Sequence, residues 1–304
     1  MRAGWAAALL VVALGAAVAR AQMPALTGAK NDQPIAIAAD NGIEWNQNKH
    51  VYIARGNATA TRGADRVEAD TLYAYYRPVG AAAAAADTHK SKNGKSDGFS
   101  GGSTEIYQIV ADGNVHFTAP NETLTGGHAV YDVDAAGLVM TGKDLRLVTP
   151  RMTITARDSL EWYNTQQMGV ARGDAIAMRD HRALRADILT ARFEKQSDGA
   201  SQVKRIDATG NVMVTSPGQI ARGDTGVYDL DTGIATLSGH VRLTRGQNEL
   251  RGRYAVVDLK NDVSQLLSAP PGTHVAGEKP QRVEGLFVPH RGAETAPQLQ
   301  VPGQ

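Results

Sequence analysis

The segment Ala-Asp-Gly-Asn-Val-His-Phe-Thr occupies positions 111–118, and its pattern decides the fold class. Its first five residues recur with small changes elsewhere in the chain. The other copies stand at 54–58, 140–144, 171–175, 208–212 and 237–241. Self-similarity at intervals of a few tens of residues is typical of folds that stack one structural unit on the next. The phrase therefore predicts a repetitive, stacked architecture.

Apolar and polar residues alternate with period two after most copies of the phrase. Val115 and Phe117 are separated by His116, and Val212 and Val214 are separated by Met213. Such alternation is typical of strands with one buried and one solvent-facing side. The Gly-Asn and Gly-Asp pairs are interpreted as tight turns that precede these strands. We expect roughly 18 to 22 short antiparallel strands in two stacked sheets.

One copy departs from the pattern. After Gly142 the apolar positions shift to Leu145 and Leu147, as a one-residue bulge would produce. No stretch of helical periodicity and ordinary length follows the N-terminal segment.

A second, larger repeat encloses the first. Several landmarks recur 117 residues later, and several others recur 97 residues later. The first set is Glu44-Trp45, Gly56 and Ala69-Asp70, and the second is Ile109, Asn114 and Tyr131-Asp132. The difference falls on 78–103, where six consecutive alanines and several glycines indicate a flexible insert. We expect an internal duplication with halves at 22–150 and 151–267, followed by a proline-rich tail at 268–304.

The N-terminus has the order of a secretory signal peptide. Arg2 precedes an uncharged run over 3–18, and Ala19-Arg20-Ala21 supplies small residues for cleavage after Ala21. The run is shorter than a membrane-spanning helix requires. We expect export of the mature chain, residues 22–304, to the periplasm.

Composition and charge exclude several classes of site. The formal net charge is +1, which does not favour nucleic-acid binding, and cysteine is absent, so disulfides and thiolate sites are excluded. The eight histidines form no closely spaced ligand pair. The Asp132/Asp134 and Asp229/Asp231 pairs are interpreted as turns, with weak calcium binding as the alternative. No metal or cofactor is expected, and distant carboxylates keep a polysaccharide-cleaving enzyme open as a minor alternative.

Small residues on the inward face raise a question about the core. Ala58 and Ala60, and their copies Ala175 and Ala177, stand where other strands carry larger apolar residues. They are compatible with a taper in the stack or with an apolar groove between the sheets. An unfilled groove would suit acyl chains, because each buried methylene contributes about 0.8 kcal/mol.

The opening segment resembles a known family. Gln33-Pro34-Ile35-Ala36-Ile37, followed by Asp40 and Glu44-Trp45, is similar to the start of the LptA/OstA-like lipopolysaccharide transport proteins. The Gly-Asn-Val strands, Ala69-Asp70 and the 127–131 segment fit the same family. The resemblance covers 33–187 and repeats to about 259. It implies an elongated, V-shaped antiparallel β-jelly roll that is not an enzyme.

The resemblance also implies a function and a set of contacts. Such a protein carries lipopolysaccharide, with the acyl chains of lipid A inside the jelly roll. Its expected partners are an inner-membrane ABC exporter complex with its periplasmic jelly-roll subunit, and an outer-membrane lipopolysaccharide assembly protein. The residues expected to contact lipid are Ile35, Ile37, Val115, Phe117 and Tyr131, with the duplicates Val212, Val214 and Tyr228. A periplasmic scaffold with a filled core is the alternative.

Overall fold

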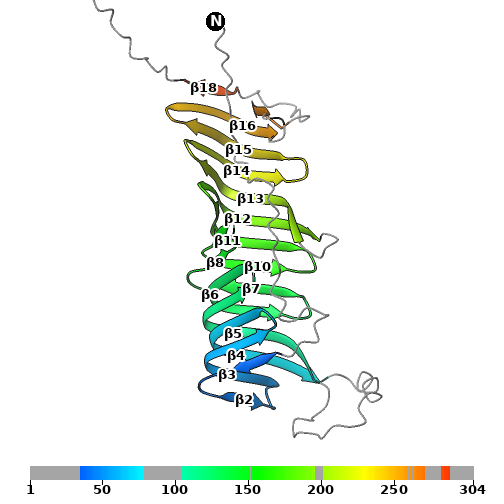
Figure 1. The fold of residues 1–304 in the computed structure, drawn as a ribbon. Coiled ribbons are helices and arrows are strands. Elements are labelled where there is room, and N and C mark those ends of the chain that lie inside the picture. The colour runs from blue at the N-terminus through cyan, green and yellow to red at the C-terminus, as the bar shows by residue number, and fades with distance from the viewer. Residues whose placement is uncertain are drawn as a thin grey trace, which may run out of the picture.

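The computed structural model describes residues 35–78, 104–150, 152–195, 201–258, 261, 263–270 and 282–287. Over these residues the chain forms 18 strands and no helix, and every strand pair is antiparallel. The strands pile up into a long stack with β2 at one end and β16 to β18 at the other (Figure 1). The expected all-β, elongated antiparallel fold is therefore confirmed.

The bounds of the strands show that many of them are long. They are β1 (Ala36–Ala38), β2 (Ile43–Asn46), β3 (Val51–Arg62), β4 (Asp65–Pro78), β5 (Thr104–Ala119), β6 (Glu122–Asp132), β7 (Gly137–Thr141), β8 (Arg146–Val148), β9 (Thr153–Thr155), β10 (Ser159–Tyr163), β11 (Met168–Arg179), β12 (Arg182–Lys195), β13 (Ser201–Ser216), β14 (Gln219–Asp229), β15 (Ile234–Arg245), β16 (Asn248–Asp258), β17 (Val263–Leu267) and β18 (Glu284–Leu286). The expectation of uniformly short strands is wrong, since β5 and β13 each have 16 residues.

The repeated glycine phrase lies inside strands, so its interpretation as a tight turn is wrong. In β5, Gly113 and Asn114 have φ angles of 78° and 47°, and the pairing register with β6 shifts between Asp112 and Val115. Two residues of one strand thus oppose one residue of the next, which defines a β-bulge. The same shift occurs in β3, β11, β13 and β15. The phrase bends each strand without ending it.

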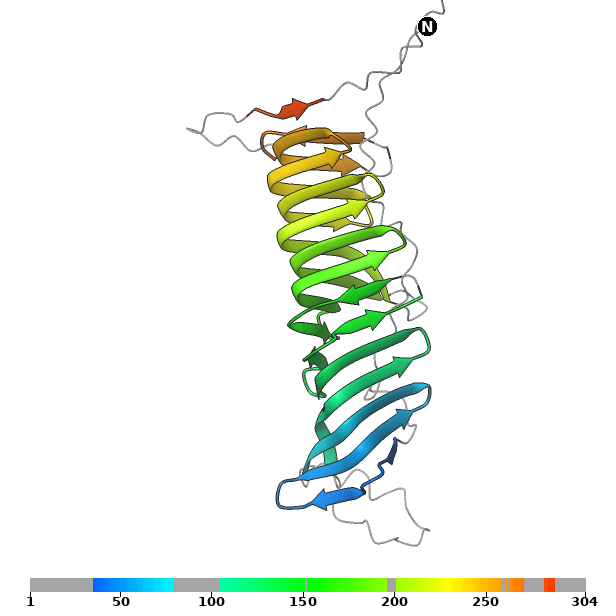
Figure 2. The ribbon, with the colours of Figure 1, turned by 90° about the vertical axis from the view of Figure 1, so that its left-hand side faces the viewer.

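These bends convert one continuous ladder into two facing sheets. Each of the long strands β3–β6 and β11–β16 continues from one sheet into the other, as the side view in Figure 2 shows. The shorter strands belong to one sheet each, with β2, β7, β10 and β17 in the first and β1, β8, β9 and β18 in the second. We call the line of bends the seam.

The exception predicted after Gly142 is larger than a one-residue bulge. Four residues, 142–145, oppose only two residues, 126–127, so β7 and β8 are separate strands. The detour places Leu145 in the core, where its side chain is 2% exposed. Gly126 makes room for it, since a Cβ there would lie 2.9 Å from Leu145 Cδ2.

Strand bounds follow the two offsets found in the sequence. β3 and β4 have the same lengths as β11 and β12, which begin 117 residues later. β5 and β6 likewise match β13 and β14, which begin 97 residues later. The division into a signal peptide, two halves and a tail stays a prediction. Residues 1–21, 79–103 and most of 268–304 lie outside the described residues. The regular array ends with β17 at Leu267, and β18 adds a short strand within the segment that was expected to be a tail.

Candidate lipid-binding groove

The inward face of the first sheet carries a row of side chains that crosses the stack. Residues directly opposite each other in paired strands point to the same face. We call this row the aromatic wall, because it contains both inward tryptophans and three tyrosines. In pairing order it is Trp45, Tyr52, Ala74, Ile109, Tyr131, Leu138, Trp162, Gly169, Ala191, Ile206, Tyr228, Ala235 and Val257.

The second sheet carries an opposing row on the other side of the seam. We call it the aliphatic wall, and every side chain in it is apolar. In pairing order it is Ile37, Ala60, Val67, Phe117, Leu124, Leu147, Ile154, Ala177, Leu184, Val214, Ala221, Leu243 and Leu250. On each long strand the two walls are separated by the bulge, so they converge toward the seam as the arms of a V.

The bottom of the V is filled by small and medium side chains. On the first sheet, the inward row next to the seam, which we call the filling row, alternates largely between alanine and leucine. Leu72 faces Ala111, and Leu189 faces Ala208. On the second sheet Ala58 is fully buried, at 0% exposure. Residues from both sides of the seam belong to one apolar cluster. The small residues nearest the seam therefore close the core and leave no groove there.

The predicted lipid contacts fall at three depths in this V. Val115 and Val212 lie at the seam and are each 1% exposed. Ile37, Phe117 and Val214 lie on the aliphatic wall. Tyr131 and Tyr228 lie on the aromatic wall, and both are half-buried. Ile35 precedes β1 and is half-buried. Strand pairing thus places seven of the eight, all but Ile35, on the inward faces, and the seam pair Val115 and Val212 lies in the closed core.

Sequence reasoning missed most of the aromatic wall. Trp45, Tyr52 and Tyr76 form a cluster, with the Trp45 and Tyr52 ring centroids 5.9 Å apart and those of Tyr52 and Tyr76 5.1 Å apart. Trp162 and Phe193 form its counterpart at 4.6 Å. Burial is the main cause that raises the pKa of Tyr52. The signal for Tyr52 was present in the sequence, because this residue stands two positions from Ala54, a buried core residue on the same strand.

Side chains that are polar except for Ala119 lie at the hairpin ends of the second sheet, at the mouth of the V. We call them the rim, and each stands two residues beyond the aliphatic wall on the same strand face. The facing pairs are Arg62–Asp65, Ala119–Glu122, Arg179–Arg182, Ser216–Gln219 and Arg245–Asn248. Burial, with a smaller contribution from the Asp65 carboxylate, raises the pKa of Glu122 to about 7.

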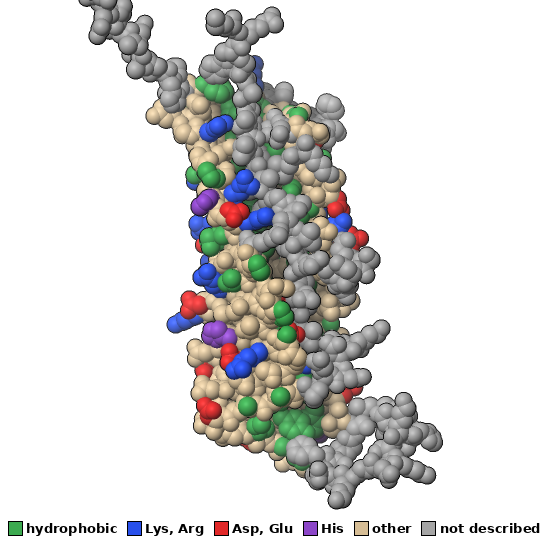
Figure 3. Space-filling model, in the orientation of Figure 1, with side chains coloured by type: hydrophobic (Ala, Val, Ile, Leu, Met, Phe, Trp, Pro, Cys, Tyr) green, Lys and Arg blue, Asp and Glu red, His purple; other side chains and the backbone are tan. Residues whose placement is uncertain are grey.

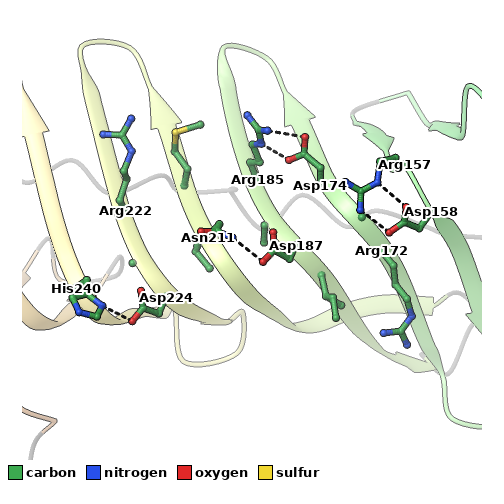
Figure 4. A pocket seen from close by; sticks show the side chains of 16 residues that line it. Arg157, Asp158, Arg172, Asp174, Arg185, Asp187, Asn211, Arg222, Asp224 and His240 are labelled. Carbon is green, nitrogen blue, oxygen red and sulfur yellow. Dashed lines mark hydrogen bonds and ion pairs between the residues drawn. The ribbon is translucent and has the colours of Figure 1, made fainter.

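A different set of charged residues lines the outside of the seam. Asp187 accepts a hydrogen bond from Asn211 at 2.9 Å, and Asp224 pairs with His240 at 2.8 Å (Figure 4). Arg185 forms a bidentate pair with Asp174. In each case a side chain at a bulge residue of positive φ binds the preceding or following strand. Charged and histidine side chains accordingly gather along one margin of the stack (Figure 3). These contacts have a structural explanation, since they hold the bends.

The aspartate pairs at the other hairpins also act as turn residues. Asp132 Oδ1 accepts the Ala135 N–H and Asp229 Oδ1 accepts the Thr232 N–H, both at 2.8 Å. The Thr232 backbone and hydroxyl lower the pKa of Asp229. Among the described residues no three histidine or carboxylate side chains are grouped to hold a metal ion. No helix in that part of the chain is long and apolar enough to cross a membrane.

Comparison with known proteins finds a family model that matches part of the chain. Residues 153–263 match the sequence model described as "LptA/(LptD N-terminal domain) LPS transport protein". That family is one of transport proteins and not of enzymes. Among solved structures, the chain is similar to LptH, described as the LptA homologous periplasmic component of the conserved lipopolysaccharide transport device from Pseudomonas aeruginosa. The identity is 20%, the TM-score is 0.38, and the match covers 45% of this chain and 95% of that chain. No curated protein sequence matches the chain.

The family match extends from β9 to the start of β17, which is the part of the chain that the sequence analysis assigned to the second half. The part of the chain over residues 153–263 is therefore similar to the LptA/LptD N-terminal family of lipopolysaccharide transport proteins.

Proposed function

We propose that this protein is a periplasmic carrier that holds the acyl chains of lipid A between the aromatic and aliphatic walls. The sugars and phosphates of the lipopolysaccharide would stay at the mouth of the V, in contact with water. The signal peptide, cleaved after Ala21, would deliver the mature chain to the periplasm. No nucleotide is used by the carrier itself, so the driving force comes from a partner.

The observation that carries this proposal is the continuity of the two walls. Each runs from the first strands of the stack to the last without a charged residue among its members. With neighbouring strands ~4.8 Å apart, the row extends on the order of 60 Å. An acyl chain gains about 0.8 kcal/mol for each methylene buried against such a wall, and it can slide because the wall offers no fixed polar contact.

The ends of the stack supply the means of bridging two membranes. Within the described residues β1 and β2 pair only with β3, and β17 and β18 pair only with β16. Their outer edges thus offer unpaired backbone groups for strand addition. One end would pair with the periplasmic jelly-roll subunit of an inner-membrane ABC exporter, and the other with an outer-membrane lipopolysaccharide assembly protein.

Binding of purified lipopolysaccharide to the mature protein tests the proposal. Val214→Asp places a carboxylate on the aliphatic wall, and we expect it to weaken binding by about tenfold or more, because an acyl chain cannot satisfy that charge. Met213→Asp is the matched control, since Met213 is the next residue on the same strand and lines the outer, charged surface.

The outcomes separate carrier from scaffold. Equal loss in both variants would show that the strand, and not the groove, is being disturbed. A folded wild type that binds no lipopolysaccharide even at low salt would favour the scaffold. That alternative has one observation behind it, because Val115 and Phe117 are closely packed in the first half, at 1% and 3% exposure.

A further inference from the structure

The aliphatic wall differs between positions that the duplication relates. In the first half it carries Ala60, Val67, Phe117 and Leu124 across four neighbouring strands. The positions 117 or 97 residues later carry Ala177, Leu184, Val214 and Ala221. Phenylalanine is replaced by valine and leucine by alanine, while only one position gains a methylene. The second half therefore has less side-chain volume on this wall.

Exposure differs between the halves at two of these four positions. Val67 and Phe117 are buried at 7% and 3%, whereas their counterparts Leu184 and Val214 are half-buried. Leu124 and Ala221 are both buried, and Ala60 and Ala177 are both half-buried. The opposite wall does not compensate, since Ala74, Ile109 and Tyr131 recur unchanged as Ala191, Ile206 and Tyr228. The second half therefore leaves apolar surface open at Leu184 and Val214, where the first half is packed.

The rim changes its charge at the same place. In the first half the rim contains Arg62, Asp65 and Glu122. The corresponding residues of the second half are Arg179, Arg182 and Gln219, so one carboxylate becomes a guanidinium and the other a neutral amide. A rim with one cation and two carboxyl groups is replaced by a rim with two cations, of which Arg179 pairs with the exposed Asp180 carboxylate of the adjoining turn at 3.8 Å.

We propose that the second half is the cargo-binding half: the open aliphatic wall at Ala177, Leu184 and Val214, with Arg179 and Arg182 at its rim, takes the acyl chains of a phosphorylated lipid. The inference rests on the proposed carrier function and assigns its cargo to one part of the stack. The first half continues the same two walls with less open surface on the aliphatic wall.

The two arginines at the rim of the second half favour an anionic amphiphile as the ligand of this groove. Acyl chains on the wall place the headgroup about two residues further along the strand, where the rim begins. Arginine binds phosphate through two parallel N–H donors. The rim of the first half would instead set carboxyl groups beside the phosphate, and like charges in a partly buried site repel. A phosphorylated lipid therefore fits the second half and not the first.

The direct test exchanges the aliphatic-wall residues between the two halves. Each substituted set of side chains already packs at the corresponding positions of the other half. In the filled variant, Leu184→Val, Val214→Phe and Ala221→Leu give the second half the wall of the first. In the emptied variant, Val67→Leu, Phe117→Val and Leu124→Ala do the reverse. Both are compared with wild type, as full mature chains, for the Kd of bisphosphorylated lipid A.

We expect the filled variant to bind about tenfold or more weakly than wild type and the emptied variant to bind at least as tightly as wild type, because emptying opens further apolar surface on the same wall. Loss of binding only in the emptied variant would overturn the proposal and place the cargo in the first half. Binding by wild type that neither exchange changes would place the lipid outside the groove. If wild type binds nothing, the carrier function itself fails, which is a different result from the other two.

Two further measurements keep the proposal testable if an exchanged variant does not fold. Arg182→Asp restores the rim charge of the first half; we expect it to weaken binding of bisphosphorylated lipid A and to abolish its advantage over monophosphoryl lipid A. Inorganic phosphate at millimolar concentration should not compete, since the acyl chains supply most of the affinity. A photoreactive residue at Leu184 should crosslink lipid A, and one at Val67 should not; the opposite pattern would contradict the assignment.

Discussion

Trp45 and Trp162 stand at related positions but differ in the state of their indole N–H groups. Trp45 Nε1 donates a hydrogen bond to the hydroxyl of Tyr76 at 2.7 Å. Phe193 replaces Tyr76 in the second half, and the buried Nε1 of Trp162 has no hydrogen-bond partner within the described part of the chain. A buried donor without an acceptor costs about 1–3 kcal/mol.

Phe193→Tyr should therefore stabilise the protein by about 1 kcal/mol, because the added hydroxyl can accept the Trp162 N–H. Chemical denaturation of the mature chain measures the change. Tyr76→Phe is the matched control in the first half and should destabilise by a similar amount. A destabilising Phe193→Tyr would show that the ring contact between Trp162 and Phe193 leaves no room for the hydroxyl.

The carboxyl of Glu122 should make the stability of the protein depend on pH. Its pKa in the folded protein is raised to about 7, mainly by burial, so the folded state binds its proton more tightly than the unfolded chain does. The stability that it contributes is present below its unfolded pKa of about 4.5 and is lost as the pH rises to about 7.

Glu122→Gln should remove this dependence. We expect the variant to be more stable than wild type at pH 8 and equal to it, or slightly less stable, at pH 4. Denaturation midpoints across this range provide the measurement. A wild-type stability that does not fall between pH 4 and pH 8 relative to the variant would contradict the assigned pKa direction.

At the scale of the element, the bulge glycine determines how each strand bends. Gly210 has a φ of 78°, and a Cβ there would lie 2.8 Å from Asp187 Cγ. Asp187 is itself fixed by its hydrogen bond with Asn211. The position therefore requires both the left-handed conformation and the absence of a side chain.

Gly210→Ala should cost about 2–4 kcal/mol, combining backbone strain with displacement of Asp187. Gly218→Ala is the matched control, since Gly218 has a φ of 76° in a hairpin turn and nothing within 4 Å of a Cβ. It should cost only about 1 kcal/mol. Thermal unfolding of both variants gives the comparison, and equal losses would mean that the contact with Asp187 carries no energy.

Strands and bulges also show where local sequence reasoning succeeds. The alternation Val115, His116, Phe117 and its copies correctly predicted strands with one inward face. The phrase before it was misassigned, because Gly-Asn with positive φ is compatible with both a hairpin turn and a bulge. The distinction depends on whether the chain reverses or continues, and the partner strands decide that.

At the scale of the molecule, the stack behaves as a one-dimensional array in which each strand contacts its neighbours in the ladder. Stability in such an array is nearly a sum over adjacent units. A cavity in one half should therefore lower the local stability of that half before it affects the other.

Phe117→Ala should remove about 3–5 kcal/mol of packing from the first half. We expect hydrogen exchange to accelerate in β3–β6 and to remain close to wild type in β13–β16. Val214→Ala should accelerate exchange in the second half, and by less, because Val214 is smaller and only half-buried. Uniform acceleration in both halves would show that the molecule opens as one cooperative unit.

The all-β class, the repeated unit and the two offsets could be predicted from the sequence alone. These properties are local or periodic, so they are visible wherever apolar residues alternate and landmarks recur at fixed spacing. The alternation of side-chain direction also correctly placed Phe117 and Val214 on inward faces, whereas Tyr131 was inferred from the family resemblance and Tyr228 from the duplication.

Three features became visible only in the folded chain. Each glycine phrase inside a strand is a bend, and the bends join two sheets into one V. The predicted contacts lie at different depths in that V. Register and facing depend on which residues meet across strands, and a single strand does not contain that information. The difference between the halves emerged in the same way. Phe117 and Val214 are both apolar in the sequence, but only their neighbours across the V determine that one fills its space and the other leaves it open.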